Sequence, residues 1–183
     1  MEEARIARKR VYEARYYVQG PMHTDTLMSL EKLALVLAKR GELVEAEQQA
    51  RKAFQLRAEK LGASHIDTLR SARILAGYLR DLGSEQQQAE AQALLQEAKK
   101  DMQQLLGLDH NETIASQELL GKVLASLGEL DQAVRELEQV VELLSKTAGP
   151  KNSQTLEVIQ TLASLKESAA LQGRGSVKRL DDS

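Results

Sequence analysis

Cysteine and tryptophan are absent from the 183 residues, and the chain has one phenylalanine and two prolines. Without cysteine the chain has no disulfide, no thiolate nucleophile and no cysteine-type zinc site, and the redox compartment stays undetermined. The shortage of aromatic residues argues against a sheet protein. Net charge is also small, −2 at pH 7, so no bulk field draws the protein to nucleic acid or an anionic membrane.

Long apolar runs are missing too. No stretch approaches the length needed to span a bilayer, and the opening Met-Glu-Glu-Ala-Arg does not resemble a secretory signal. We therefore expect no membrane insertion and, by default, a cytoplasmic location. The residues that are present, 42% hydrophobic and 28% charged with leucine and alanine dominant, are typical of a folded and mostly helical chain.

One motif, G-x-x-[HN]-x-x-T-[LI], occurs four times. Its threonines are separated by 42, 45 and 42 residues and are Thr26, Thr68, Thr113 and Thr155. A second marker, glycine followed by two small or aliphatic residues, recurs between the motifs at Gly41, Gly83 and Gly128. The three extra residues of the middle unit must lie between Gly83 and Ala91, in the glutamine-rich stretch Ser84–Gln88. The chain is therefore a repeat protein.

Each unit has the pattern of two helices. The first has an apolar stripe at helical spacing, made of Leu27, Leu30, Leu33, Ala34 and Leu37. After Gly41 a second stripe follows, made of Ala46, Ala50, Ala53, Phe54 and Leu61. Small residues at one position of the first helices let helix backbones approach closely, and these are Ala34, Ala76, Gly121 and Ala163.

The motif residues themselves are predicted to be structural. The glycines Gly20, Gly62, Gly107 and Gly149 are expected to end helices in the left-handed conformation. Three residues later His23, His65, His110 and Asn152 are expected to cap the next helix, since asparagine replaces histidine once. Acidic residues precede three of the motif threonines, where they favour the positive end of the helix dipole.

This spacing of small residues resembles the tetratricopeptide repeat, and the long unit with its G-x-x-H-x-x-T junction resembles the repeats of kinesin light chains. The resemblance covers roughly residues 3–171. It implies an all-α fold, a right-handed α-solenoid of tetratricopeptide-type helix pairs with about eight helices. It also implies a protein-binding scaffold in place of an enzyme.

The repeat frame divides the chain into six segments. We expect residues 1–20 to be the second helix of an incomplete repeat, 21–62, 63–107 and 108–149 to be three full repeats, 150–172 to be the first helix of a final repeat, and 173–183 to be a flexible tail. The first segment offers the apolar residues Ile6, Val11, Tyr12, Tyr16 and Tyr17. Either the chain is part of a longer array or its open ends pair with something, which includes self-association.

No motif for catalysis, a metal or a cofactor is present. The only histidines recur once per repeat, so they do not converge as zinc ligands would. The glycines stand singly and form no phosphate-binding loop. We therefore expect no enzymatic activity and no cofactor.

The concave side of such an array, lined by the first helices, is the predicted binding surface. Basic residues outnumber acidic ones there over three repeats, and the candidates for a peptide-binding groove are Lys32, Lys39, Arg70, Arg73, Arg80 and Lys122. Arginine bonds carboxylates in bidentate fashion, so an acidic partner peptide is one hypothesis, and it resembles how kinesin light chains hold acidic cargo. A solvated helix face, a self-associating segment and a targeting module of a larger protein are the alternatives.

Overall fold

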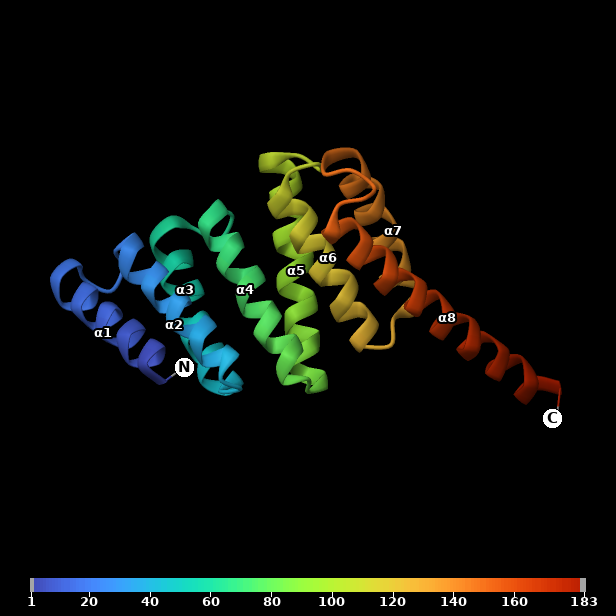
Figure 1. The fold of residues 1–183 in the computed structure, drawn as a ribbon, viewed down its shortest axis with the longest axis horizontal. Helices are drawn as coiled ribbons and strands as arrows, with labels where there is room; N and C mark the ends of the chain where they lie inside the picture. Colours follow the sequence, from blue (N-terminus) through green and yellow to red (C-terminus); the bar gives the residue numbers. More distant parts are fainter. Residues whose placement is uncertain (1, 182–183) are drawn as a thin grey trace. The chain divides into compact units, whose positions relative to one another are not determined.

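The structure is a computed structural model that describes the backbone of residues 2–181 and the side chains of residues 2–171. Its described residues form eight α-helices and no strand (Figure 1). They are α1 (Glu2–Gln19), α2 (Thr24–Lys39), α3 (Leu43–Leu61), α4 (Ile66–Leu82), α5 (Glu85–Leu106), α6 (Asn111–Ser126), α7 (Leu130–Thr147) and α8 (Ser153–Asp181). The prediction of an all-α chain with eight helices is confirmed.

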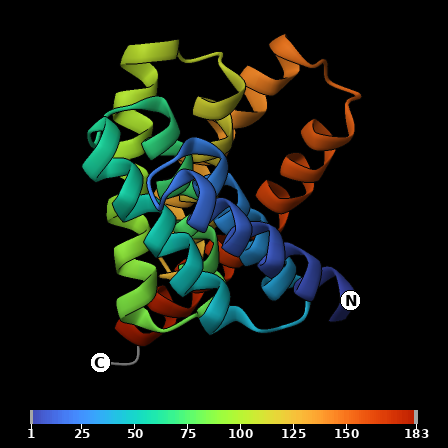
Figure 2. The same cartoon turned by 90° about the vertical axis from the view of Figure 1, so that its left-hand side faces the viewer.

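The helices fall into two compact units, and the first extends to Leu105. In this unit α1 packs on α2, α2 on α3 and α3 on α4. Leu69 of α4 is buried in a cluster with Ala98 and Met102 of α5, so α5 continues the stack. Figure 2 shows this unit with α1 toward the viewer.

The second unit begins at Leu106 and contains α6, α7 and α8, packed in that order. Its core includes an apolar cluster to which all three helices contribute: Ile114, Leu137, Val140, Leu144, Val158 and Leu162. Gly121 lies where α6 and α7 approach closely, since a Cβ added there would be 2.7 Å from the Leu137 side chain. The predicted close approach of two helices at this position is therefore present.

The apolar stripes lie where their spacing indicates. All five predicted stripe residues of α2 are buried, and so are the three alanines predicted on α3. The other two predicted α3 residues differ, because Phe54 is half-buried and Leu61 is 37% exposed. Leu61 is the last residue of its helix. Ala163, inside α8, is also exposed.

The three extra residues of the middle unit lengthen the start of α5. Ser84 and Gln87 form a capping box there: Gln87 N donates to Ser84 Oγ at 3.3 Å, and Ser84 N donates to Gln87 Oε1 at 3.3 Å. The equivalent helices α3 and α7 have Glu42 and Glu129 at the N-cap without a side-chain cap bond. The inserted segment therefore supplies its own helix start.

Gly62 differs from the predicted left-handed cap. Its φ is +92° as expected, but its ψ is 158°, so the backbone is not in the left-handed helical region. This second region is open essentially to glycine alone, whereas asparagine tolerates the left-handed helical one. The glycine requirement at this junction is therefore stricter than the sequence suggested. Gly83, inside a repeat, does adopt the left-handed helical values, φ 81° and ψ 0°.

The end of the chain also differs from expectation. Helix α8 continues through residues 173–181, for which a flexible tail was predicted, and residues 182 and 183 lie outside the described residues. Two glycines in this stretch cost a helix about 1 kcal/mol each, but it has no proline to stop the helix. The division into repeats at the junction glycines stays a prediction. Among the residues described, no helix is long and apolar enough to cross a bilayer.

Candidate peptide-binding groove

A groove runs between α2 and α4 in the first unit, and it contains two adjoining hollows. The first, here called the apolar hollow, has a volume of about 330 Å³. It is lined by Met28, Glu31, Lys32, Leu35, Ile74 and Tyr78. Lys32 is one of the basic residues predicted for the groove, whereas Tyr78 was not predicted.

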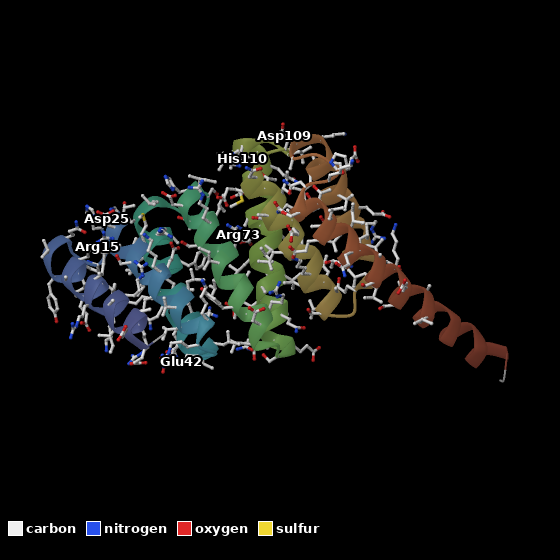
Figure 3. The ribbon with its side chains drawn as sticks, in the orientation of Figure 1. Arg15, Asp25, Glu42, Arg73, Asp109 and His110 are labelled. Atoms are coloured by element: carbon white, nitrogen blue, oxygen red, sulfur yellow. The ribbon has the colours of Figure 1, made fainter. Side chains whose placement is uncertain are left out.

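The second hollow, here called the arginine hollow, has a volume of about 220 Å³. Three arginines, Arg57, Arg70 and Arg73, line it together with Thr24, Met28, Glu31, Asp67 and Ile74. Figure 3 labels Arg73 on α4. Because Met28, Glu31 and Ile74 line both hollows, the two form one continuous surface with an apolar part and a charged part.

A buried polar network forms the floor of the groove. Arg57 extends from α3 between the two groove helices, is only 5% exposed, and donates through Nη1 to the Glu31 carboxylate and to Ser71 Oγ. Ser71 Oγ in turn donates to Glu31 Oε1 at 2.7 Å. One carboxylate therefore receives both a guanidinium and a hydroxyl, which fixes its position.

An equivalent contact joins α1 to α2. Arg15 Nη1 donates to Ser29 Oγ at 2.7 Å and to the Asp25 carbonyl oxygen at 2.9 Å, and Figure 3 shows Arg15 close to Asp25. Sequence reasoning missed both arginines. A signal was present, because Arg15 and Arg57 each stand five residues before a junction glycine, on helices otherwise read only for their small residues.

Tyr78 forms one wall of the apolar hollow, and its ring is largely buried. Burial raises the pKa of its hydroxyl, and the nearby carboxylates of Glu31 and Asp81 raise it further, because each disfavours the charged phenolate. The Tyr78 hydroxyl is therefore neutral at physiological pH.

The five predicted basic residues of the first unit do not line one hollow. Arg70 and Arg73 line the arginine hollow and Lys32 the apolar one, whereas Lys39 and Arg80 line neither. Lys122 belongs to α6 in the second unit, where its Nζ lies 2.6 Å from Glu118 and 3.7 Å from Glu157.

Several of these cations already face carboxylates of the same chain. Arg70 Nη1 lies 3.2 Å from Asp67 Oδ1, and Arg80 Nη2 lies 2.6 Å from Asp81 Oδ1. The groove is therefore less positive than a count of its basic residues indicates.

The residues of the repeated motif lie at helix starts. The side chains of His23, His65 and His110 accept from the backbone N–H two residues later, at 3.2, 3.1 and 3.2 Å. Asn152 accepts in the same way from Gln154 N at 2.9 Å. The four motif threonines, Thr26, Thr68, Thr113 and Thr155, are fully buried behind them. Each histidine therefore caps the start of the helix that follows it.

Models of the tetratricopeptide repeat match residues 26–67 and 84–146, together more than half of the chain. The chain belongs to the tetratricopeptide-repeat family. Its repeats are of the kinesin light chain-like kind, and its fold is an all-α tetratricopeptide solenoid. Tetratricopeptide repeats of this type generally form protein-interaction scaffolds and are typically not enzymes.

Solved structures agree with this assignment. A Podosopora anserina protein described as a kinesin light chain with nearly identical TPR-like repeats has a TM-score of 0.79 at 25% identity, covering 99% of this chain and 84% of that one. BtubC (BKLC) from P. vanneervenii, at 18% identity, has a TM-score of 0.73 and shares the fold, with 92% of this chain and 66% of that chain covered.

A human protein is also similar in sequence to these tetratricopeptide repeats. The Clustered mitochondria protein homolog of Homo sapiens is 31% identical over 134 residues, which is 73% of this chain. The chain spans 10% of the length of that relative.

Proposed function

We propose that this protein is a scaffold that holds an extended segment of a partner protein in the groove between α2 and α4. The observation that carries the proposal is the continuity of the two hollows, which share Met28, Glu31 and Ile74. Alternate side chains of an extended segment point to the same face and lie about 6.6 Å apart, so residues i and i+2 could enter the two hollows. The partner is a segment with a large apolar side chain near an anionic one.

The apolar hollow supplies most of the affinity in this proposal. Met28 and Leu35 are 37% and 49% exposed, so a bound apolar side chain would remove apolar surface of both partners from water. The charged part adds selectivity, because the carboxylates beside its arginines limit the net attraction. We therefore expect moderate salt dependence in place of the steep dependence of a purely basic groove.

The test is fluorescence anisotropy with labelled nonapeptides that carry one central leucine or tryptophan flanked by aspartate and glutamate. Leu35→Lys should weaken binding at least tenfold, since it places a charge in the apolar hollow. Leu156→Lys is the matched control, because Leu156 is 51% exposed on α8. Equal effects of the two substitutions, or no binding by any peptide, would contradict the proposal.

Self-association is the alternative that the exposed apolar residues of α1 favour. Tyr17 and Val18 are each 84% exposed, and Val11 is 41% exposed. Light scattering over a range of concentrations measures this directly. A dimer that ignores the peptides would support self-association over the groove.

A further inference from the structure

The arginine hollow is a more specific feature than an acidic-peptide groove requires. Three guanidinium groups from two helices, Arg57 on α3 and Arg70 and Arg73 on α4, line about 220 Å³. Two carboxylates, Glu31 and Asp67, line the same space, so the formal charge of the hollow is one positive. Arg57 is nearly completely buried, so its guanidinium is held in a fixed position.

Those two carboxylates decide which anion can bind. Glu31 is paired with Arg57, and Asp67 Oδ1 lies 3.2 Å from Arg70 Nη1. A carboxylate of a partner carries the same single charge as Asp67 and offers Arg70 no better acceptor. It also loses entropy on binding, which Asp67, three residues away on the same helix, does not. An aspartate or glutamate of the partner therefore gains little in this hollow.

We propose that the arginine hollow binds a phosphorylated serine or threonine side chain of the partner segment. A phosphate monoester carries about −1.5 to −2 charges at pH 7 and three acceptor oxygens, so it can outcompete Asp67 where a carboxylate cannot. Arginine forks match these oxygens in bidentate geometry. Thr24, the first residue of α2, lines the same hollow, where the positive end of the helix dipole adds to the attraction.

The inference rests on the proposed function and deepens it. The adjoining apolar hollow determines which residue of the bound segment lies at the arginines. A large apolar side chain in that hollow would bring the phosphorylated residue to the arginines. The partner is thus a segment whose binding is switched on by phosphorylation, in place of one that is constitutively acidic.

The experiment compares three nonapeptides with one central leucine that differ at a single position two residues from it, which is serine, glutamate or phosphoserine. We expect phosphoserine to bind about tenfold more tightly than glutamate, and glutamate about as weakly as serine. Arg73→Gln should remove the preference for phosphoserine, and Arg73→Lys, which keeps the charge without the fork, should retain part of it. Arg80→Gln is the control on the same helix, because Arg80 pairs with Asp81 and lines neither hollow.

A second variant tests the reason for the selectivity. Asp67→Asn removes the competing carboxylate, so it should strengthen binding of the glutamate peptide. The difference in affinity between the glutamate and phosphoserine peptides should therefore become smaller. Circular dichroism confirms that each variant is folded. Equal affinity for the glutamate and phosphoserine peptides would overturn this inference while the groove proposal stands, whereas failure of all three peptides to bind would overturn both.

Discussion

One register position, five residues before the junction glycine, is filled differently at the α3–α4 junction of the first unit and the α7–α8 junction of the second. In the first unit Arg57 occupies it and bonds Ser71 and Glu31, whereas in the second unit Leu144 packs against Val158, the counterpart of Ser71. Both residues are buried. The same helix junction can therefore be closed by charge-assisted bonds or by apolar contact. Only the polar version places functional groups on a groove floor.

The largest expected effect on stability comes from placing an arginine at the position of Leu144 in the second unit. Leu144→Arg would bury a guanidinium among the aliphatic side chains of this cluster, where Val158 stands in place of the Ser71 hydroxyl, and we expect a loss of more than about 4 kcal/mol of unfolding free energy. Urea unfolding followed by circular dichroism measures it. Leu171→Arg, at a position 69% exposed, is the control. A loss below about 1 kcal/mol for Leu144→Arg would show that this junction is not tightly packed.

Breaking the polar junction should cost somewhat less. Arg57→Ala leaves the mostly buried Glu31 carboxylate without its ion pair, and we expect a loss of about 3 kcal/mol. The triple variant Arg57→Leu, Glu31→Leu, Ser71→Val removes all three polar side chains of the network together and should recover most of that stability. If the triple variant is as unstable as Arg57→Ala, the two ways of closing the junction are not interchangeable.

Gly121 offers a smaller test, because the first unit has Ala76 at the same position. Gly121→Ala would place a Cβ 2.7 Å from Leu137 Cδ2, and moving that side chain should cost about 1–2 kcal/mol. Thermal unfolding of Gly121→Ala, alone and with Leu137→Val, separates crowding from other causes. Rescue by the smaller neighbour is expected, and a stabilised Gly121→Ala would contradict the close approach.

The smallest effect should come from the helix caps. His65→Ala removes the acceptor for Asp67 N and should cost about 1 kcal/mol. His65→Asn should cost almost nothing, because Asn152 makes the same bond in the last copy of the motif. Denaturant midpoints of the two variants compare them, and equal losses would indicate that the imidazole ring does more than cap.

The repeat architecture could be predicted from the sequence because its signals are local. The stripe of Leu27, Leu30 and Leu37 and the helix starts at His23 and Asn152 depend on residues a few positions apart, and spacing alone indicates them. The periodicity of apolar residues predicts which side of a helix is buried, and it does so without knowledge of which helix packs against that side.

The groove floor could not be predicted in the same way. Arg57 bonds Glu31, 26 residues before it, and Ser71, 14 residues after it, so the network exists only once three helices are placed. The count of basic groove residues was misleading for a related reason. It took Arg70 and Arg80 as available cations, although each has a carboxylate of its own helix beside it.

The Arg57 network also determines how large a segment of this array can be grafted into another repeat protein. Repeats are often regarded as modules that can be shuffled, duplicated or grafted at their sequence boundaries. Here the bonds of Arg57 reach back to Glu31 and forward to Ser71 across the boundary glycine, Gly62. A graft cut at that glycine would part Arg57 from one of its partners, so the smallest transplantable cassette of the first unit spans Glu31 to Ser71.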